Sequence, residues 1–445
     1  MSGFDDSDFK RLLGIIERTE SSRKREEADA YANAAGSVGS DGSVSSAGSI
    51  GSAGSIGSAS SLDSVLSYPC DRMVSGLIFV GEEPDLIFGN IYIENGIIKE
   101  IEETPVKSEN WIVPRFVNTH THIGDTFLKD PPLGNPIGPF VVQRDLDALV
   151  KPPNGIKHRF LAALDYETSV LSMESAIWDM YQNGISVFAD FREGGISGAQ
   201  ALIEAICNTA RNIHPVVFGR PAAVCPSPDS AFSSSLTIDF LEELRSLLEI
   251  TDGIGISGAN DMDDYTLSKI SSKTASKRKK LAVHAGEKDR SDIDAALSLH
   301  PDMLIHMTHA EPADIKKAAD ADISVSVCVR SNLTTGVGLP PVPDMLQAGI
   351  RVSIGTDNMM LNSPDMFEEI HFLSKIYGLS DKTIFKMAAS AGADTLGCRF
   401  TGTIDVGKKA DLLILNSKSE NLKYVRDPLA GYARRARADD ILGII

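Results

Sequence analysis

The chain has 445 residues, of which 42% are hydrophobic and 23% charged, as is typical of a globular protein. Its 43 basic residues are outnumbered by 61 acidic ones, and the net charge of −18 argues against a nucleic-acid or anionic-membrane surface. The five scattered cysteines form no CxxC pair, which fits reduced thiols and argues against a disulfide framework or a structural zinc knuckle.

The N-terminal region is predicted to be a tail over residues 1–68. Its first residues, MSGFDDSDFK, are acidic and lack the apolar segment of a secretory signal. A Gly/Ser tract follows, GSVGSDGSVSSAGSIGSAGSIGSASS, which is predicted to be a disordered linker because it cannot bury enough apolar surface. No stretch approaches the roughly 20 apolar residues of a membrane helix, so we expect a cytoplasmic protein without a membrane partner.

Two β-rich segments flank the middle of the chain. SGLIFVGEEPDLIFGNIYIENGIIKEIEE alternates apolar and polar residues between turn signals, and FTGTIDVGKKADLLILN does the same near the other end. They predict one composite β domain built from residues 69–113 and 397–445.

The middle, residues 114–396, repeats a strand and then a helix. Eight apolar strands are predicted at 113–118, 184–190, 215–219, 253–257, 280–284, 302–306, 323–328 and 351–356. This rhythm predicts a (β/α)₈ barrel of the TIM type. A doubly wound open sheet is the alternative, although no GxGxxG opens a first βα unit.

Metal-binding side chains stand at the ends of several predicted strands. His120 and His122 follow the first strand and point to the same side, while His284 ends the fifth, His306 the sixth and Asp357 the eighth. In a barrel, chemistry lies at the carboxyl ends of the strands. One such histidine is usually a polar cap, but the joint occurrence favours a metal site.

The motifs resemble those of the amidohydrolase superfamily, above all its cytosine deaminase, S-adenosylhomocysteine deaminase and triazine chlorohydrolase branch. The resemblance runs from about residue 73 to the C-terminus and rests on FVNTHTHIGDT, NGISVFADF, VHAGEKD, IHMTHA, SNLTTGVGLPPVPDMLQAGIRVSIGTDN and SPDMFEEI. It implies that His120, His122, His284 and Asp357 bind one divalent metal ion, Zn²⁺ or alternatively Fe²⁺, and that His306 lies near the attacking water.

Glu287 narrows the predicted chemistry. The H-x-x-E of His284 and Glu287 resembles the deaminases of this family, in which such an acid moves protons from the water to the substrate. Asp357 could be a second proton acceptor, and His309 is the alternative to His306 as the catalytic histidine of the sixth strand. A solvated Glu287 in the charged EKDRSD run is the competing interpretation.

The number of metal ions is predicted from the fourth strand. Binuclear members of the superfamily typically bridge two metals with a carboxylated lysine or a glutamate from the middle of the barrel. GIGISGAND contains neither, which favours one ion.

Three arginines follow strand ends and are candidates to bind an anionic group of a small-molecule substrate: Arg192, Arg220 and Arg330. Pairing with local acids is the alternative for each. Asn332 lies in a loop that borders the pocket in the family and is a further substrate-binding candidate. The Pro/Gly-rich segment 131–140 is either a pocket-covering loop or a plain surface loop.

Three functions remain open from the sequence. The first is a metal-dependent deaminase of a purine, a pyrimidine or a related cyclic amidine. The second is hydrolysis of a cyclic amide, or of a halide- or amine-substituted heterocycle, at the same site. The third is a catalytically silent scaffold, which predicts eroded ligands, whereas all of the metal-site residues are present. A homo-oligomer is compatible with each.

Overall fold

The computed structural model describes residues 72–131, 145–151, 155–222 and 238–445. The predicted tail, most of the Pro/Gly-rich segment 131–140 and the first residues of the composite β domain lie outside these ranges. Within them, no helix is both long and apolar enough to cross a bilayer.

A curled sheet of parallel strands holds the middle of the chain together. It consists of β5 (Phe116–His122), β6 (Ile185–Arg192), β7 (His214–Gly219), β8 (Gly253–Ile256), β9 (Lys280–Ala285), β10 (Met303–His306), β11 (Ser324–Val327), β12 (Val352–Ile354) and β13 (Asp357–Asn358). The strand order is β12-β11-β10-β9-β8-β7-β6-β5-β13.

The sheet closes on itself at the segment that contains β12 and β13. The two strands stand at opposite ends of the order, yet only Gly355 and Thr356 separate them in the chain. β12 pairs with β11, whereas β13 pairs with β5 in the register Asp357 to Thr121. Residues 352–358 therefore act as the eighth strand of a closed barrel, and the predicted (β/α)₈ fold is confirmed.

All eight predicted strand positions contain barrel strands, with one difference in the first. The predicted strand 113–118 is divided between β4 (Trp111–Pro114), which belongs to another sheet, and β5. The division falls at Arg115, whose buried guanidinium donates to the backbone oxygens of Asn212 (2.8 Å) and Ile185 (2.5 Å). The chain thus passes from one sheet to the next without a loop, which apolar periodicity does not reveal.

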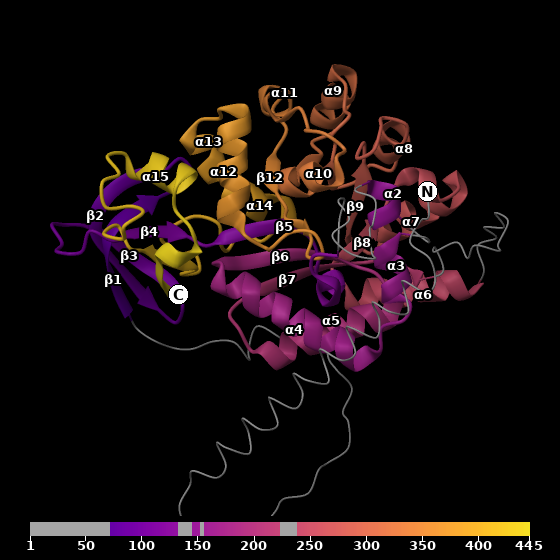
Figure 1. The fold of residues 1–445 in the computed structure, drawn as a ribbon, viewed down its shortest axis with the longest axis horizontal. Helices are drawn as coiled ribbons and strands as arrows, with labels where there is room; N and C mark the ends of the chain where they lie inside the picture. Colours follow the sequence, from indigo (N-terminus) through magenta and orange to yellow (C-terminus); the bar gives the residue numbers. More distant parts are fainter. Residues whose placement is uncertain (1–71, 132–144, 152–154, 223–237) are drawn as a thin grey trace, which may run out of the picture. The chain divides into compact units, whose positions relative to one another are not determined.

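Helices follow the barrel strands and lie around their outside (Figure 1). They are α3 (Ile156–Leu161), α4 (Tyr166–Gln182), α5 (Gly195–Thr209), α6 (Ile238–Ile250), α7 (Asp264–Ser276), α8 (Ile293–Ser298), α9 (Pro312–Asp320), α10 (Val329–Thr335), α11 (Val342–Gln347), α12 (Met366–Tyr377), α13 (Asp381–Ala388) and α14 (Ser390–Leu396). α4 begins where Asp165 accepts a hydrogen bond from the Thr168 amide, and it buries Val170, Met173 and Ile177 against the barrel.

The second sheet is built from both flanks of the chain, as predicted. Its order is β15-β14-β4-β1-β2-β3, formed by β1 (Arg72–Val80), β2 (Asp85–Glu94), β3 (Ile97–Glu103), β4, β14 (Leu412–Leu415) and β15 (Ile441–Ile444). Figure 1 shows the indigo strands and the yellow C-terminal segment side by side. β14 pairs with β4 in register Leu412 to Pro114, so the C-terminal segment lies beside the strand that leads into the barrel.

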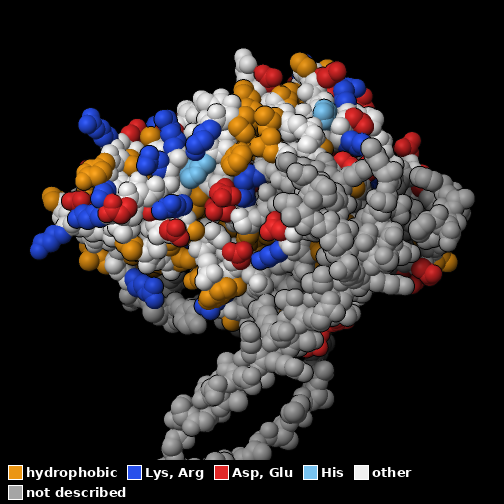
Figure 2. Space-filling view, viewed as in Figure 1, with side chains coloured by type: hydrophobic (Ala, Val, Ile, Leu, Met, Phe, Trp, Pro, Cys, Tyr) orange, Lys and Arg blue, Asp and Glu red, His pale blue; other side chains and the backbone are white. Residues whose placement is uncertain are grey.

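Aromatic side chains connect this sheet to the barrel helices. Phe79 of β1 stacks on Phe385 of α13 with ring centroids 5.9 Å apart, and it also contacts Tyr432 of α15 (Pro428–Arg434). These residues belong to one buried apolar cluster with Phe116 of β5. On the described part of the surface drawn in Figure 2, basic and acidic side chains are interspersed.

Candidate functional site

The four residues implied as metal ligands come together at the carboxyl end of the barrel. His120 and His122 lie near and at the end of β5, His284 in β9 and Asp357 at the start of β13. The Nε2 atom of His120 is 3.1 Å from Asp357 Oδ1 and 3.2 Å from His284 Nε2, and His122 Nε2 is 3.6 Å from the same carboxylate oxygen. The donor atoms of His120, His122 and Asp357 all lie within 4.8 Å of one another, and His284 adjoins this group through His120.

The histidine ring orientations suit coordination. His284 Nδ1 lies 2.8 Å from the Ile256 carbonyl oxygen and donates to it, so its Nε2 presents a lone pair to the centre. Burial lowers the pKa of His120 to about 3, and His284 is likewise held neutral by burial and by the neighbouring histidines, which keep its pKa low. Neutral imidazoles are the form that binds metals.

Asp357 is fixed so that one oxygen faces this centre. Its Oδ2 accepts from Ser331 Oγ at 2.5 Å and from Asn358 Nδ2 at 2.9 Å, which leaves Oδ1 directed at His120. Its backbone has a φ of 61°, a left-handed conformation rarely adopted outside glycine. Gly355, two residues before it, approaches so closely that an added Cβ would lie 2.5 Å from the Cβ of His120. Three imidazoles and one carboxylate can hold a divalent metal ion.

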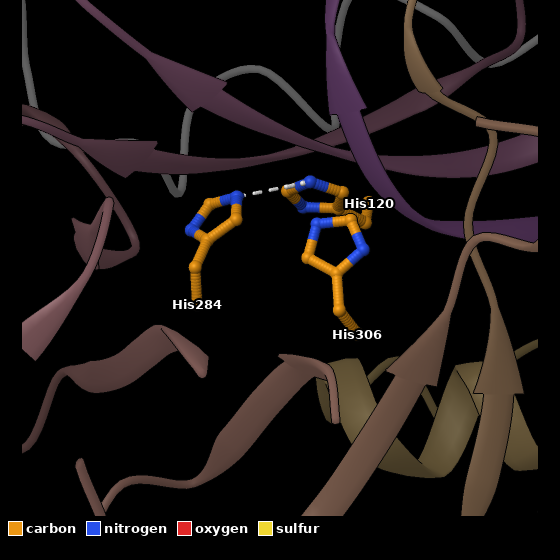
Figure 3. Close-up of side chains that lie close together, drawn as sticks. All are labelled: His120, His284 and His306. Atoms are coloured by element: carbon orange, nitrogen blue, oxygen red, sulfur yellow. Dashed lines mark hydrogen bonds between the residues drawn. The ribbon is translucent and has the colours of Figure 1, made fainter. Parts of the chain in front are cut away.

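His306 stands beside these four residues. Its Nδ1 lies 2.9 Å from Asn332 Oδ1, and the Asn332 amide nitrogen donates to Thr308 Oγ1 at 2.8 Å, which fixes the amide orientation. His306 therefore donates through Nδ1 and turns Nε2 inward. Figure 3 shows its ring facing those of His120 and His284. His309, the alternative, is exposed on the surface.

Glu287 lies in the same cavity, as the H-x-x-E pattern implied. Its Oε1 is 3.6 Å from His306 Nε2, and it forms a potential ligand group with His306 and Asp357. Burial raises the pKa of this carboxyl above its usual range. The cavity beside the donor atoms is lined by both charged and polar residues, among them His122, Lys157, His158, Glu193, Arg220, Asp261, His284, Glu287, Asp292, His306, Asp357 and Asn358.

The structure separates the three predicted arginines. Arg220 lines the cavity with 8% of its surface exposed, and its Nε has no hydrogen-bond partner among the described residues. Arg192 instead donates to the side chain and backbone oxygen of Glu193, both at 3.1 Å. Arg330 donates to Glu369 at 2.7 Å and also contacts Glu368. Asn332 supports His306 and does not line the cavity.

A buried polar cluster of Lys157, Glu193 and Asp125 lies next to the donor atoms and was not predicted from the sequence. Lys157 of α3 forms an ion pair with Glu193, and Glu193 contacts His122. Asp125 lies in the short 3₁₀ helix Ile123–Leu128, where it is fully buried and accepts from the Met360 amide at 2.9 Å. Glu193 follows a strand end and could have been found on that ground, whereas Lys157 lies on a helix outside any strand pattern.

Comparisons with known proteins agree with this geometry. The sequence pattern of the amidohydrolase family matches residues 111–436. An uncharacterised protein of Methanocaldococcus jannaschii is 32% identical, with 81% of this chain and 94% of that protein covered. A 5-methylthioadenosine/S-adenosylhomocysteine deaminase of Haloquadratum walsbyi is 25% identical, with 81% of this chain and 88% of that enzyme covered.

Solved structures share the fold at low sequence identity. A zinc-bound adenosine deaminase from Xanthomonas campestris superimposes with a TM-score of 0.68 at 18% identity, covering 85% of this chain and 92% of that one. Atrazine chlorohydrolase from Arthrobacter aurescens, complexed with zinc, gives 0.68 at 16% identity, covering 84% and 93%. With the barrel, the converging donor atoms and the matched sequence pattern together, the chain belongs to the amidohydrolase family.

Proposed function

We propose that this protein is a metal-dependent deaminase that hydrolyses a purine, a pyrimidine or a related cyclic amidine and releases ammonia. The observation that carries the proposal is Glu287, whose carboxyl, with 17% of the side chain exposed, faces His306 in the cavity beside the four donor atoms. A hydrolase that only polarises a carbonyl does not require a second acid at this place, whereas deamination requires protons to be delivered to two nitrogens.

One zinc ion is the proposed cofactor, bound by His120, His122, His284 and Asp357. The edge between two adjacent nitrogens bound to one Zn²⁺ ion at about 2.0–2.1 Å is roughly 3 Å long. The 3.2 Å between the Nε2 atoms of His120 and His284 matches that edge. Adenosine deaminase and atrazine chlorohydrolase of the same fold contain zinc, and Fe²⁺ is the alternative. β8 ends at Ile256 and brings no lysine or glutamate, which supports a single ion.

When bound, the metal acts as a Lewis acid that lowers the pKa of a water molecule. Glu287 takes a proton from the attacking water and delivers it to the ring nitrogen of the substrate. It then takes the remaining proton of the former water from the new carbon-bound hydroxyl and passes it to the departing amine, so that the carbon–nitrogen bond breaks and ammonia leaves, with the oxygen left bonded to the carbon. The raised pKa of Glu287 suits a group that must both accept and return protons.

His306 and Asp357 complete the proposed catalytic set. Asn332 holds the His306 ring with Nε2 facing the cavity, where it can hydrogen-bond to the water or to the oxygen that develops from it. Asp357 serves as a ligand and as a second proton acceptor. Its Oδ2 is occupied by Ser331 and Asn358, so Oδ1 carries both roles.

Arg220 is the proposed contact for an anionic group on the substrate. It is a buried guanidinium beside the cavity, with an unpartnered Nε among the described residues, and a carboxylate or phosphate would satisfy it. Arg192 and Arg330 already bind Glu193 and Glu369, so they are not part of this proposal.

The test is a screen for ammonia release on zinc-loaded protein, across nucleobases, nucleosides and nucleosides with a carboxylate-bearing substituent. Glu287→Gln protein measures the background. Release of ammonia that depends on Glu287 supports the proposal. Halide release from chlorinated heterocycles, or ring opening of a cyclic amide without ammonia, would replace it with the second function, and no turnover of any compound would favour the silent scaffold.

We further propose that the chain divides into a tail over residues 1–68, a composite β domain over 69–113 and 397–445, and a hydrolase barrel over 114–396. The two flanking segments share one sheet, which supports treating them as one unit. A cytoplasmic location is consistent with the scattered cysteines of the sequence.

A further inference from the structure

Lys157 is a buried lysine whose ammonium group lies among three acceptor atoms. Only 3% of its side chain is exposed. Its Nζ lies 2.7 Å from Glu193 Oε1, 3.3 Å from Asn358 Oδ1 and 3.4 Å from Asp125 Oδ2. An ammonium group can only donate, so Lys157 donates to Asn358 and pairs with Glu193, while Asp125 lies within ion-pair distance.

Two of the three acceptors continue to the proposed metal ligands. Glu193 Oε1 lies 3.0 Å from His122 Nδ1, the ring nitrogen on the opposite side from the one that faces Asp357. Asn358 uses its amide oxygen for Lys157 and its amide nitrogen to donate to Asp357 Oδ2 at 2.9 Å. One ammonium group is therefore connected, through one intermediate each, to ligands on both sides of the barrel seam.

The contacts of Glu193 show why a cation is required at this place. Its Oε1 lies 2.7 Å from Lys157 Nζ and 3.0 Å from His122 Nδ1, while its Oε2 accepts from Arg192 at 3.1 Å. A buried carboxylate needs such compensation to remain charged. A charged Glu193 in turn favours the tautomer of His122 with the proton on Nδ1, which leaves Nε2 free to bind a metal.

Asn358 is fixed by the same cation. An asparagine amide can be turned in either of two directions, and only one of them donates to Asp357. Lys157, which can only donate, selects the direction in which the oxygen faces Nζ and the nitrogen faces the carboxylate.

We propose that Lys157 is a positioning residue that orients His122 through Glu193 and Asp357 through Asn358, and thereby sets the metal affinity of the site. The inference rests on the metal site of the proposed function. It assigns to a helix outside the barrel strands a role that neither the ligand motif nor the resemblance includes.

The test compares the zinc affinity of Lys157→Met, Lys157→Arg and Lys129→Met proteins with that of the wild type, by competition with a chromophoric chelator. Lys129 is the matched control because it is half exposed and pairs only weakly, at 3.9 Å, with Asp179. Losing support of this kind weakens metal binding by about 10- to 100-fold. We expect that loss for Lys157→Met, a partial recovery for Lys157→Arg and no change for Lys129→Met.

The visible spectrum of the Co²⁺-substituted proteins reports ligand geometry without any substrate. We expect the Lys157→Met spectrum to differ from that of the wild type and the Lys129→Met spectrum to match it. Wild-type zinc affinity and an unchanged Co²⁺ spectrum in Lys157→Met would overturn the proposal. Absence of recovery in Lys157→Arg would also overturn it, because the effect would then come from packing and not from charge.

A second variant covers the case in which Lys157→Met does not fold, since it leaves Glu193 with less compensation. Lys157→Met/Glu193→Gln removes both charges of the closest pair and is expected to fold. It should still bind zinc at least tenfold more weakly than the wild type, and wild-type affinity would count against the proposal. Because these measurements need no substrate, failure of the ammonia screen would leave their outcome unaffected.

Discussion

The Nε2 atoms of His120 and His284 lie 3.2 Å apart, although His284 already donates through its other nitrogen to the Ile256 carbonyl oxygen. Two ring nitrogens this close, in a buried site that also holds the carboxylate of Asp357, favour a bound cation over empty space. The arrangement ties β5 to β9 across the barrel interior.

Removal of one of these rings should abolish metal binding. We expect His120→Ala protein, loaded with zinc and then dialysed to remove the unbound metal, to retain less than about a tenth of an equivalent of zinc. Only three donors would remain, and His284 would lose the ring nitrogen next to it. Elemental analysis measures this directly. His300→Ala, which changes an exposed histidine, should keep the wild-type content, and a full equivalent in His120→Ala would refute the ligand assignment.

Substitution of His306 and of His309, which lie in and just after the sixth strand, should affect kcat very differently. His306→Ala is expected to lower kcat by about 10²–10⁴-fold, the usual range for a group that assists proton transfer or charge stabilisation. His309→Ala should leave kcat within about twofold, because this side chain is exposed. Steady-state assays of both proteins on the substrate found by the ammonia screen decide the matter, and the reverse pattern would assign the role to His309.

Glu287→Gln should remove catalysis and spare the metal. The amide keeps the size of the side chain but cannot carry protons between water and substrate, so kcat should fall by about 10²–10⁴-fold. Zinc content should stay at one equivalent. Glu249→Gln on the exposed face of α6 is the matched control, and substantial activity in Glu287→Gln would exclude the proton-transfer role.

Loss of Arg220 should affect substrate binding, whereas loss of Arg330 should affect stability. Arg220→Met is expected to raise KM at least tenfold, about 1.4 kcal/mol, for a substrate with an anionic group and to leave a neutral analogue unaffected. Arg330→Met should instead lower the free energy of unfolding by about 3–5 kcal/mol, because it leaves the buried Glu369 without its ion pair. Kinetics on paired substrates and chemical denaturation test the two statements, and equal KM values for both substrates in Arg220→Met would reject the first.

His371 should contribute to acid sensitivity. Burial, with the nearby charge of Lys375, lowers the pKa of His371 from 6.5 to about 4, although the Ala436 backbone and Glu368 act in the opposite direction. The unfolded chain therefore binds a proton at higher pH than the folded protein does. The stabilising effect is complete above pH 6.5 and is lost as the pH falls toward 4.

A comparison of variants isolates this effect from other acid-sensitive groups. The loss of stability between pH 7 and pH 4.5 should be smaller by about 1 kcal/mol in His371→Asn than in the wild type, after allowance for solvent screening. Urea denaturation at both pH values measures it. Identical losses in the two proteins would show that folding does not lower the pKa of His371.

The barrel was predictable because its strands are short apolar runs bounded by polar or turn residues, a pattern that periodicity detects. The boundary at Arg115 was not, since Trp111–Pro114 and Phe116–His122 are both apolar and differ only in the sheet that they join. Sheet membership depends on the distant partner β14, which local sequence does not encode.

Some residues of the site could likewise be predicted from the sequence, and others could not. His120, His284 and Asp357 could be placed because every strand of a parallel barrel ends at the same face. Arg330 could not be distinguished from Arg220, since its fate depends on Glu369 in α12, 39 positions later. Lys157 was not predicted because its neighbours come from three separate segments, the 3₁₀ helix after β5, the end of β6 and β13, and no periodic signal marks it.

The seam of the barrel is held by few backbone contacts. β13 pairs with β5 only through Asp357 with Thr121 and Asn358 with His122, and the side chains of Asn118 and Thr119 add bonds to Thr356, Ser353 and the Ile354 carbonyl. An ion bound at this place would cross-link residues 237 positions apart in the chain. Amide hydrogen exchange in residues 352–358 should therefore slow on metal loading more than exchange in β7, whose pairing lies away from the ion.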